Sequence, residues 1–275
     1  MDWSLVLASQ DIAASIERGG DRQWFLIVSA GDHERALQSI RQYRLENRGW
    51  RWRQAFFGQD LTWHWCGAVW CIVLAEMFIL STGEFSEIHQ AWILHSAAAR
   101  SGEWWRIFTA LILHADLVHL LANLTTGGLL FGLAMGRYGS GCGSLACYLA
   151  GALGNVLGLI IHSKPYDGLG ASGMVMAALG LIAAPGFSIW KAPLGAYRQA
   201  GKSVLAATLL FVLLGLNPAS DVVAHFGGFA AGIVFGLLLN ALPNGVLSQP
   251  VVGVGSWIAL ALLMLWTGWL GFWQK

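Results

Sequence analysis

The stretch "DGLGASGMVMAALG", residues 167–180, places one serine, Ser172, where a polar loop gives way to an apolar run. Its neighbours Gly170, Ala171 and Gly173 are small, so another backbone can approach the hydroxyl closely. A helix that begins here would also direct free N–H groups toward a developing negative charge. The stretch alone is compatible with a loose turn, a helix-packing surface or a nucleophile. The positions of the other polar groups must decide among these.

Histidines and an asparagine in two other apolar segments could act with this hydroxyl. His225, in "AHFGGFAAGIVFG", is a candidate general base for Ser172. In "HADLVHLLANL", His119 and Asn123 lie four residues apart on one helical face, where both can offer hydrogen bonds to an oxyanion. His114 precedes His119 by five residues, which turns it away from that face. We therefore expect His114 to be a structural residue at the helix entrance.

Glycines follow His225 at every fourth position, as Gly228, Gly232 and Gly236. Such a stripe lets the backbone of a neighbouring helix come close. It predicts that this helix packs against the helix that begins at Ser172. That contact would shorten the distance between the imidazole and the hydroxyl.

The histidines do not have the pattern of a metal site. The sequence lacks His-Glu-x-x-His, and no Asp or Glu stands where a membrane metalloprotease would need one, so neither a metal nor another cofactor is expected. The four cysteines lie within or at the ends of apolar segments and are expected to be small buried side chains: Cys66, Cys71, Cys142 and Cys147.

The composition indicates a membrane protein. Hydrophobic residues make up 56% of the 275 positions and charged residues only 11%, against about 25% charged in soluble proteins. Eight of the sixteen Lys and Arg residues lie within the first 53 positions. The net charge of +1 favours no nucleic-acid partner. We expect a polytopic membrane protein, in contact with the lipid bilayer, that carries a small soluble N-terminal region.

Seven apolar segments are candidates to span the membrane. Two of them are short, which the interior of a bundle tolerates. If the N-terminus is cytoplasmic, the inner segments carry more Lys and Arg than the outer ones, so we expect this orientation. The first residues, "MDWSLVLASQD", lack the pattern of a signal peptide. The seven segments are 61–82, 115–136, 142–162, 171–186, 203–216, 222–242 and 251–273.

This topology brings the polar residues of the membrane segments to one depth in the outer leaflet. Polar groups are costly in a bilayer and usually mark a functional site. The loop "HSKPYDGLG" beside this layer can admit the water that hydrolysis needs. Hydrogen bonds between helices are expected for Glu76 and Asn155, and a gating role for Glu76 stays open. The layer consists of Glu76, His119, Asn123, Asn155, Ser172 and His225.

Two regions outside the spans have patterns of their own. Residues 1–55 predict a small cytosolic α/β domain with strands at "WSLVLAS" and "WFLIVSA". A helical stretch is expected after each strand, the second being "DHERALQSIRQYRLENR" with Asp32 as its cap. Residues 83–106 contain the amphipathic "IHQAWILHSAAA" and predict a partly submerged interfacial loop.

Three elements, taken together, resemble the rhomboid family of intramembrane serine proteases. They are "WWRIFTALILHADLVHLLANL", "GASG" and "AHFGGFAAG", in the family's order, and they cover about residues 102 to 236. The resemblance implies an all-α polytopic membrane protein with a rhomboid-like six-helix bundle. The expected division is an N-terminal cytosolic domain at 1–55, the protease core at 56–242, and an additional C-terminal helix at 243–275 whose end lies outside.

The resemblance also implies a role for each motif residue. Ser172 would be the nucleophile and His225 the general base, without an acidic third member. The oxyanion would be stabilised by His119, Asn123 and the Ser172 N–H, while His114 would be structural. Trp105 and Arg106 would anchor the interfacial loop, and Gly170, Gly173, Gly228 and Gly232 would shape the site.

One motif position departs from the pattern. Some bacterial members carry an aromatic residue four positions after the serine, stacked on the catalytic histidine, and this chain has Met176 there. A thioether packs against an imidazole but orients it less firmly. The departure concerns the support of His225 and not its identity.

The expected activity is hydrolysis of peptide bonds in or near the transmembrane segments of membrane-protein substrates. A catalytically inactive relative that binds membrane clients is the first alternative, and retention of the motif residues argues against it. A transporter is the second, and the sequence lacks the expected internal repeat. The expected location is a bacterial inner membrane with the N-terminus in the cytoplasm. No sequence feature bears on the oligomeric state.

Overall fold

A computed structural model describes residues 2–19, 24–46, 62–82, 86–187, 196–216, 220–243 and 245–273. The chain divides into two compact units, Met1–Asp60 and Leu61–Lys275. Each unit has its own hydrophobic core. The two are therefore described separately.

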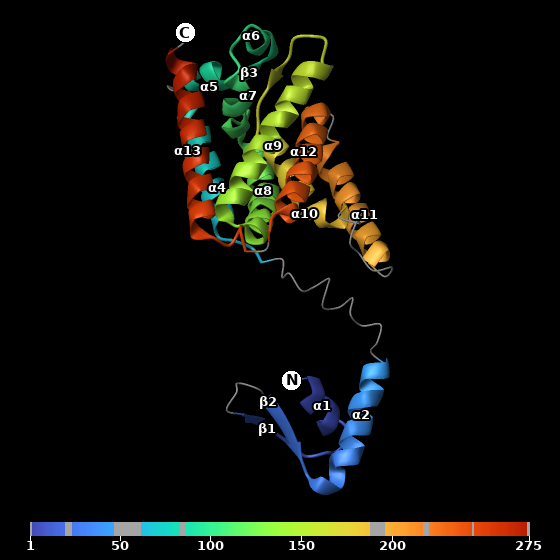
Figure 1. The fold of residues 1–275 in the computed structure, drawn as a ribbon. Helices are drawn as coiled ribbons and strands as arrows, with labels where there is room; N and C mark the ends of the chain where they lie inside the picture. The colour runs from blue at the N-terminus through green and yellow to red at the C-terminus, as the bar shows by residue number, and fades with distance from the viewer. Residues whose placement is uncertain are drawn as a thin grey trace. The chain divides into compact units, whose positions relative to one another are not determined.

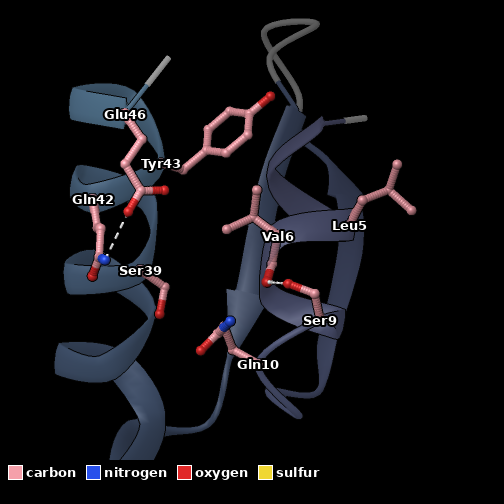
Figure 2. A pocket seen from close by; sticks show the side chains of 8 residues that line it. All are labelled: Leu5, Val6, Ser9, Gln10, Ser39, Gln42, Tyr43 and Glu46. Carbon is pink, nitrogen blue, oxygen red and sulfur yellow. Dashed lines mark hydrogen bonds between the residues drawn. The ribbon is translucent and has the colours of Figure 1, made fainter. Parts of the chain in front are cut away.

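The N-terminal unit is a two-stranded sheet with two helices. Strand β1 (Ala14–Arg18) pairs antiparallel with β2 (Trp24–Val28), with Ala14 opposite Val28. Helices α1 (Asp2–Ala8) and α2 (His33–Glu46) pack together, and Leu7, Ile12 and Ala36 form a small buried core. A pocket of about 420 Å³ lies between the two helices (Figure 2).

The expected order of elements in this unit is partly wrong. "WSLVLAS" belongs largely to helix α1, and the region expected to be helical after it contains strand β1. A short, mostly apolar run fits a helix as well as a strand, and here contacts with α2 favour the helix. The second strand and the second helix are confirmed. Asp32 is the last residue of the short 3₁₀ helix η1 (Ala30–Asp32) before α2, and its carboxylate pairs with Arg35 at 3.0 Å.

The membrane unit is a bundle of helices in which every expected span contains a helix (Figure 1). Four of those within the described ranges are long and apolar enough to cross a membrane: α8 (Leu117–Tyr138), α9 (Ser140–Ile161), α12 (Val222–Ala241) and α13 (Pro250–Trp273). The other three have shorter apolar portions: α4 (Cys66–Leu80), α10 (Ser172–Phe187) and α11 (Ala196–Gly215). The chain is thus an all-α polytopic membrane protein with a small N-terminal strand region.

The segment between α4 and α8 is more ordered than the expected loop. It is built from short elements: α5 (Ser86–Trp92), β3 (Leu94–His95), α6 (Ser96–Arg100), α7 (Arg106–Thr109) and η3 (Ala110–Ile112). Strand β3 pairs antiparallel with β4 (Asp167–Gly168), with His95 opposite Asp167. This pairing ties the segment to the loop that leads into α10.

Helix α10 lies at the centre of the bundle and is packed most closely against α12. A Cβ atom on Gly228 would collide with the Gly173 carbonyl oxygen, and one on Gly232 would collide with the Ala177 carbonyl oxygen. The expected packing of the glycine stripe against the serine helix is confirmed. Only glycine permits this approach, so the stripe sets how close α12 lies to α10.

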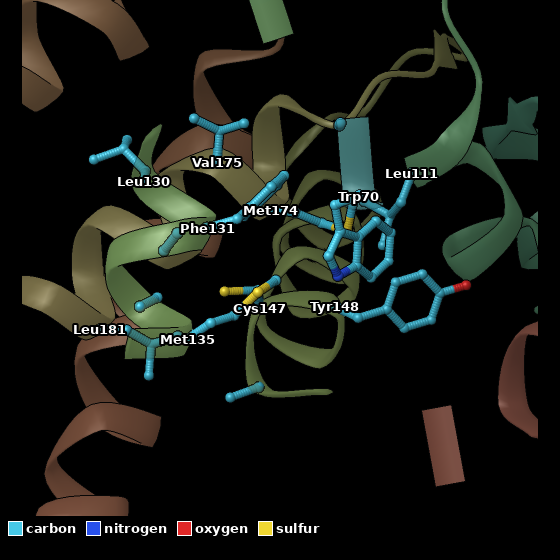
Figure 3. Close-up of a cluster of buried hydrophobic side chains, with 14 of the residues drawn as sticks. Trp70, Leu111, Leu130, Phe131, Met135, Cys147, Tyr148, Met174, Val175 and Leu181 are labelled. Carbon is cyan, nitrogen blue, oxygen red and sulfur yellow. The ribbon is translucent and has the colours of Figure 1, made fainter. Parts of the chain in front are cut away.

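A core of large apolar side chains fills the space between α4, α8, α9 and α10 (Figure 3). Trp70 and Tyr148 stack with ring centroids 6.3 Å apart, and Cys147 and Met174 lie beside them. The four cysteines are free thiols, three of them buried and Cys71 half-buried. They act as small side chains of the interior, as expected.

The two polar residues without a motif role differ from one another. Asn155 donates from Nδ2 to the Ile107 carbonyl at 2.8 Å and so joins α9 to α7, as expected. Glu76 is exposed on α4. No neighbouring helix among the described residues hydrogen-bonds to its carboxylate, so the expected interhelical bond is wrong.

Candidate active site

Ser172 and His225 meet directly. The Ser172 Oγ atom lies 2.7 Å from Nε2 of His225, although the two residues are 53 positions apart. His225 is buried, with 3% of its surface exposed, and Ser172 is half-buried as the first residue of α10. The glycine contacts between α10 and α12 hold the two side chains at this distance.

A backbone carbonyl sets the tautomer of His225. Nδ1 of the ring lies 2.8 Å from the carbonyl oxygen of Gly215, at the end of α11. Because a carbonyl oxygen only accepts, Nδ1 must carry the hydrogen and donate it. In the neutral ring Nε2 then holds the lone pair, and it can accept the hydroxyl hydrogen of Ser172. The pair is arranged for transfer of a proton from serine to histidine.

Met176 contributes to this arrangement indirectly. A Cβ atom on Gly215 would lie 3.3 Å from the Met176 sulfur. The thioether therefore packs beside the residue whose carbonyl orients His225. The sequence has Met176 in place of an aromatic residue that would orient the His225 ring. In the structure, the hydrogen bond from Nδ1 to the Gly215 carbonyl orients this ring.

The loop before Ser172 is held by its own backbone. Gly170 has a φ of +124°, which strains any other residue, and its N–H donates to the Ala110 carbonyl at 2.9 Å. A Cβ atom on Gly170 would lie 2.6 Å from Cε1 of His119. The ring of His119 thus lies against the turn that presents the hydroxyl.

Asn123 is buried on the same helix as His119, and its Nδ2 donates to the His119 carbonyl at 3.1 Å. Within the described residues it makes no hydrogen bond to Ser172. Asp116 caps the start of helix α8, and its carboxylate accepts the His119 N–H at 2.8 Å. The structure therefore places His119 beside the serine loop and Asn123 one turn further along α8.

Arg106 cross-links the segment between α4 and α8, and Trp105 is buried next to it in the chain. Trp105 is buried, with 3% of its surface exposed. Arg106 donates from Nη1 to the Ile93 carbonyl at 2.7 Å, and its Nε pairs with Glu103 at 2.6 Å. The anchoring role that the resemblance implies for these two residues stays a prediction.

Two features near the site were missed by the sequence reasoning. Gly215 acts through its backbone carbonyl, which no side-chain pattern predicts. The one available signal was its place before "LNP", which marks the end of a helix, where carbonyl groups lack partners within the helix. Asp221 caps α12 by accepting the N–H groups of Val223 and Ala224, both at 3.0 Å. An aspartate just before an apolar helix is a readable cap signal. It fixes the start of the helix at Val222, three residues before His225.

His114 lies in the loop before α8, buried to 1% exposure, with its ring 5.2 Å from that of His119. Neither ring nitrogen hydrogen-bonds to a described residue. Burial, and then the nearby His119, lower the pKa of His114 from 6.5 to about 4. The ring is therefore neutral at pH 7.

Among the described residues, no three His, Cys, Asp or Glu side chains are grouped to hold a metal.

The lowered pKa of His114 makes stability depend on pH. Between pH 6.5 and about 4 the unfolded chain protonates this ring while the folded chain does not. The folded state should therefore lose up to about 1.4 kcal/mol per pH unit as the pH falls through this window. Melting temperatures in detergent from pH 7 to pH 4 measure the effect. If His114→Asn melts with the same pH dependence as the wild type, the assignment is wrong.

Comparison with known proteins supports the resemblance. The Rhomboid domain family model matches residues 101–242. Rhomboid protease GluP of Bacillus subtilis is 30% identical over 169 residues, 61% of this chain and 32% of that protein. RHOMBOID-like protein 4 of Arabidopsis thaliana is 31% identical over 151 residues, 53% of this chain and 36% of that protein. The putative rhomboid protease YdcA of Bacillus subtilis is 26% identical over 146 residues, which are 52% of this chain and 71% of that protein.

The fold and the site define a multi-pass membrane protein that holds a serine and a histidine in contact where α10 and α12 meet. The family match covers more than half of the chain, and the chain belongs to the rhomboid family. It spans about a third of the length of the first two relatives named above.

Proposed function

We propose that the protein is an intramembrane serine endopeptidase that uses Ser172 as nucleophile and His225 as general base. The observation that carries the proposal is the 2.7 Å contact between Oγ and Nε2, together with the Nδ1 bond to Gly215. If Ser172 and His225 served only to pack the helices, their side chains would not need to pair as hydrogen-bond donor and acceptor. With a neutral ring, this geometry lets Nε2 accept the hydroxyl proton in the first step.

In the first step Nε2 takes the hydroxyl proton while Oγ attacks the carbonyl carbon of the scissile bond. The resulting imidazolium keeps its Nδ1–H on the Gly215 oxygen, which stabilises the positive charge. The Nε2 proton then passes to the leaving amine as the C–N bond breaks. Water attacks the acyl-enzyme with His225 again as base, and the acid product leaves as Ser172 regains its proton.

The oxyanion that forms in these steps needs donors. The Ser172 N–H lies at the start of α10, where helix N–H groups lack partners within the helix. His119 lies against the adjacent turn at Gly170. Asn123 has a second N–H beyond the one given to His119. These three groups are proposed as the oxyanion site.

Asn123→Ala tests one of these donors. Loss of a single oxyanion donor should lower kcat by about 10²-fold, because the lost bond forms mainly in the transition state. Thr126→Val is the matched control, since among the described residues the Thr126 hydroxyl bonds only to the Ala122 carbonyl of its own helix, at 2.7 Å. Initial rates against a membrane-anchored reporter give kcat for each. Unchanged kcat in Asn123→Ala would remove the residue from the role.

The substrates proposed are membrane proteins whose transmembrane helix unwinds easily near small residues. Unwinding is required because a helix keeps the scissile carbonyl hydrogen-bonded and out of reach of Ser172. The proposed division is a cytosolic domain at 1–55, a protease core at 56–242 and a C-terminal helix at 243–275. We place the protein in a bacterial inner membrane with its N-terminus in the cytoplasm.

The experiment is reconstitution of the purified protein in lipid vesicles with a single-span reporter that carries small residues near its outer end. Cleavage into two fragments, with a cut inside or beside the span, supports the proposal. Recovery of the intact reporter in complex with the protein would instead indicate a client-binding relative without activity.

A further inference from the structure

The C-terminal helix α13 contacts the segment that leads to the site. It runs along the outside of the unit beside α5, α7 and α9 (Figure 1). Trp92, the last residue of α5, donates its indole N–H to the Gly268 carbonyl at 3.2 Å. A Cβ atom on Gly271 would lie 2.7 Å from Cδ1 of Trp92. Gly268 and Gly271 therefore form a notch in α13 that receives this one indole.

The other half of α13 is fixed to α9. A Cβ atom on Gly141 would collide with the Gly253 carbonyl, so the two helices are in backbone contact there. Trp257 donates its indole N–H to the Ser140 hydroxyl at 3.2 Å. Helix α13 is thus fastened to the bundle at one end and holds Trp92 at the other.

A short chain of hydrogen bonds connects Trp92 to the serine loop. The Trp92 carbonyl accepts the Thr109 hydroxyl at 2.8 Å. The next residue, Ala110, accepts the Gly170 N–H at 2.9 Å, two positions before Ser172. From the notch in α13, the path to the turn that presents the nucleophile consists of the Trp92–Gly268 bond, these two bonds and the Thr109–Ala110 peptide link.

We propose that α13 is a brace for the active site and that Trp92, seated in the glycine notch, is a positioning residue for Ser172. This inference rests on the proposed protease activity for its kinetic consequence. A helix that served only as a membrane anchor would need neither a notch fitted to one indole nor a backbone contact with α9. Displacing Trp92 should leave Ser172 and His225 present but less well aligned.

Gly271→Ala tests the brace, because the new methyl group must displace Trp92. Gly255→Ala is the matched control: the same change on the same helix, with nothing within 4 Å of the added atom. In vesicles with the reporter, kcat of Gly271→Ala should fall about 10-fold with little change in KM, since misalignment acts on the chemical step. The fraction of protein that a fluorophosphonate labels at completion should stay unchanged, whereas misfolding would lower it.

A second readout does not depend on activity. Amide hydrogen exchange of peptides covering 107–113 and 166–172 should be faster in Gly271→Ala than in Gly255→Ala, because the Gly170 N–H bond loosens. Equal exchange and equal kcat in the two variants overturn the brace. A wild type that never cleaves, with this exchange difference present, overturns the proposed function and leaves the brace standing.

If Gly271→Ala does not fold, Trp92→Phe takes its place. It keeps a ring in the notch but removes the N–H that binds Gly268. A several-fold lower kcat with full labelling supports the brace. Wild-type kcat and wild-type exchange in this variant overturn it.

Discussion

Replacement of Ser172 by alanine is expected to abolish cleavage of a membrane-anchored reporter, with a loss of roughly 10⁴-fold or more in kcat. The change removes only Oγ, the atom that lies 2.7 Å from Nε2 of His225. The packing of α10 against α12 depends on Gly173 and Gly228 and is untouched. The variant should therefore fold as the wild type does.

A buried serine elsewhere in the bundle gives the control. Ser144 on α9 is fully buried, and its hydroxyl donates to the Ser140 carbonyl at 2.7 Å. Ser144→Ala removes the same atom and should cleave at nearly the wild-type rate. Cleavage by Ser172→Ala at the wild-type rate, measured by reporter fragments on gels, would end the serine-protease proposal.

Replacement of His225 by alanine should cost nearly as much. Ser172 would lose the lone pair that accepts its proton, and the leaving amine would lose its proton donor. The two residues act as one unit, so the double variant Ser172→Ala, His225→Ala should be little worse than either single variant. Reporter kcat/KM for the three variants tests this. Losses that multiply would show that the residues act independently.

His64 serves as the control histidine. Its N–H bonds to the Gly132 carbonyl, well along α8 from His119, and its Nδ1 accepts the Cys66 N–H. His64→Gln should change activity little. A loss comparable to that of His225→Ala would mean that histidine substitutions act through the fold instead of through proton transfer.

The contact between serine and histidine was predictable because two independent patterns converge on it. Small residues around Ser172 permit close approach, and Gly228 and Gly232 supply the matching surface on α12. The predicted topology also places the two residues at the same depth in the membrane. Such patterns survive in sequence because only glycine fits where two backbones touch.

The hydrogen bond from His225 to Gly215 could not be predicted in the same way. Every residue has a carbonyl group, so the choice of Gly215 follows from where α11 ends and not from a side chain. The same holds for the bond from Gly170 to Ala110, which depends on the path of the segment before α8. Sequence patterns identify side chains better than they identify the backbone atoms that orient them.

Short elements were predicted least well. The run expected as the first strand belongs largely to helix α1, because a seven-residue run with five apolar residues fits either structure and tertiary contacts decide. Glu76 was expected to face a neighbouring helix but is exposed on α4, since depth along a helix says nothing about which face a residue occupies. The long, continuous apolar runs had no such ambiguity.

The account depends on a serine whose hydroxyl is activated by one histidine, and covalent labelling tests this directly. A fluorophosphonate probe reacts with an activated serine, and mass spectrometry of the digested protein then identifies the modified residue. We expect one modified site, Ser172, and no modification in His225→Ala on the same timescale. A reporter-cleaving preparation that stays unmodified at Ser172, or that takes the label at another residue, would contradict the account.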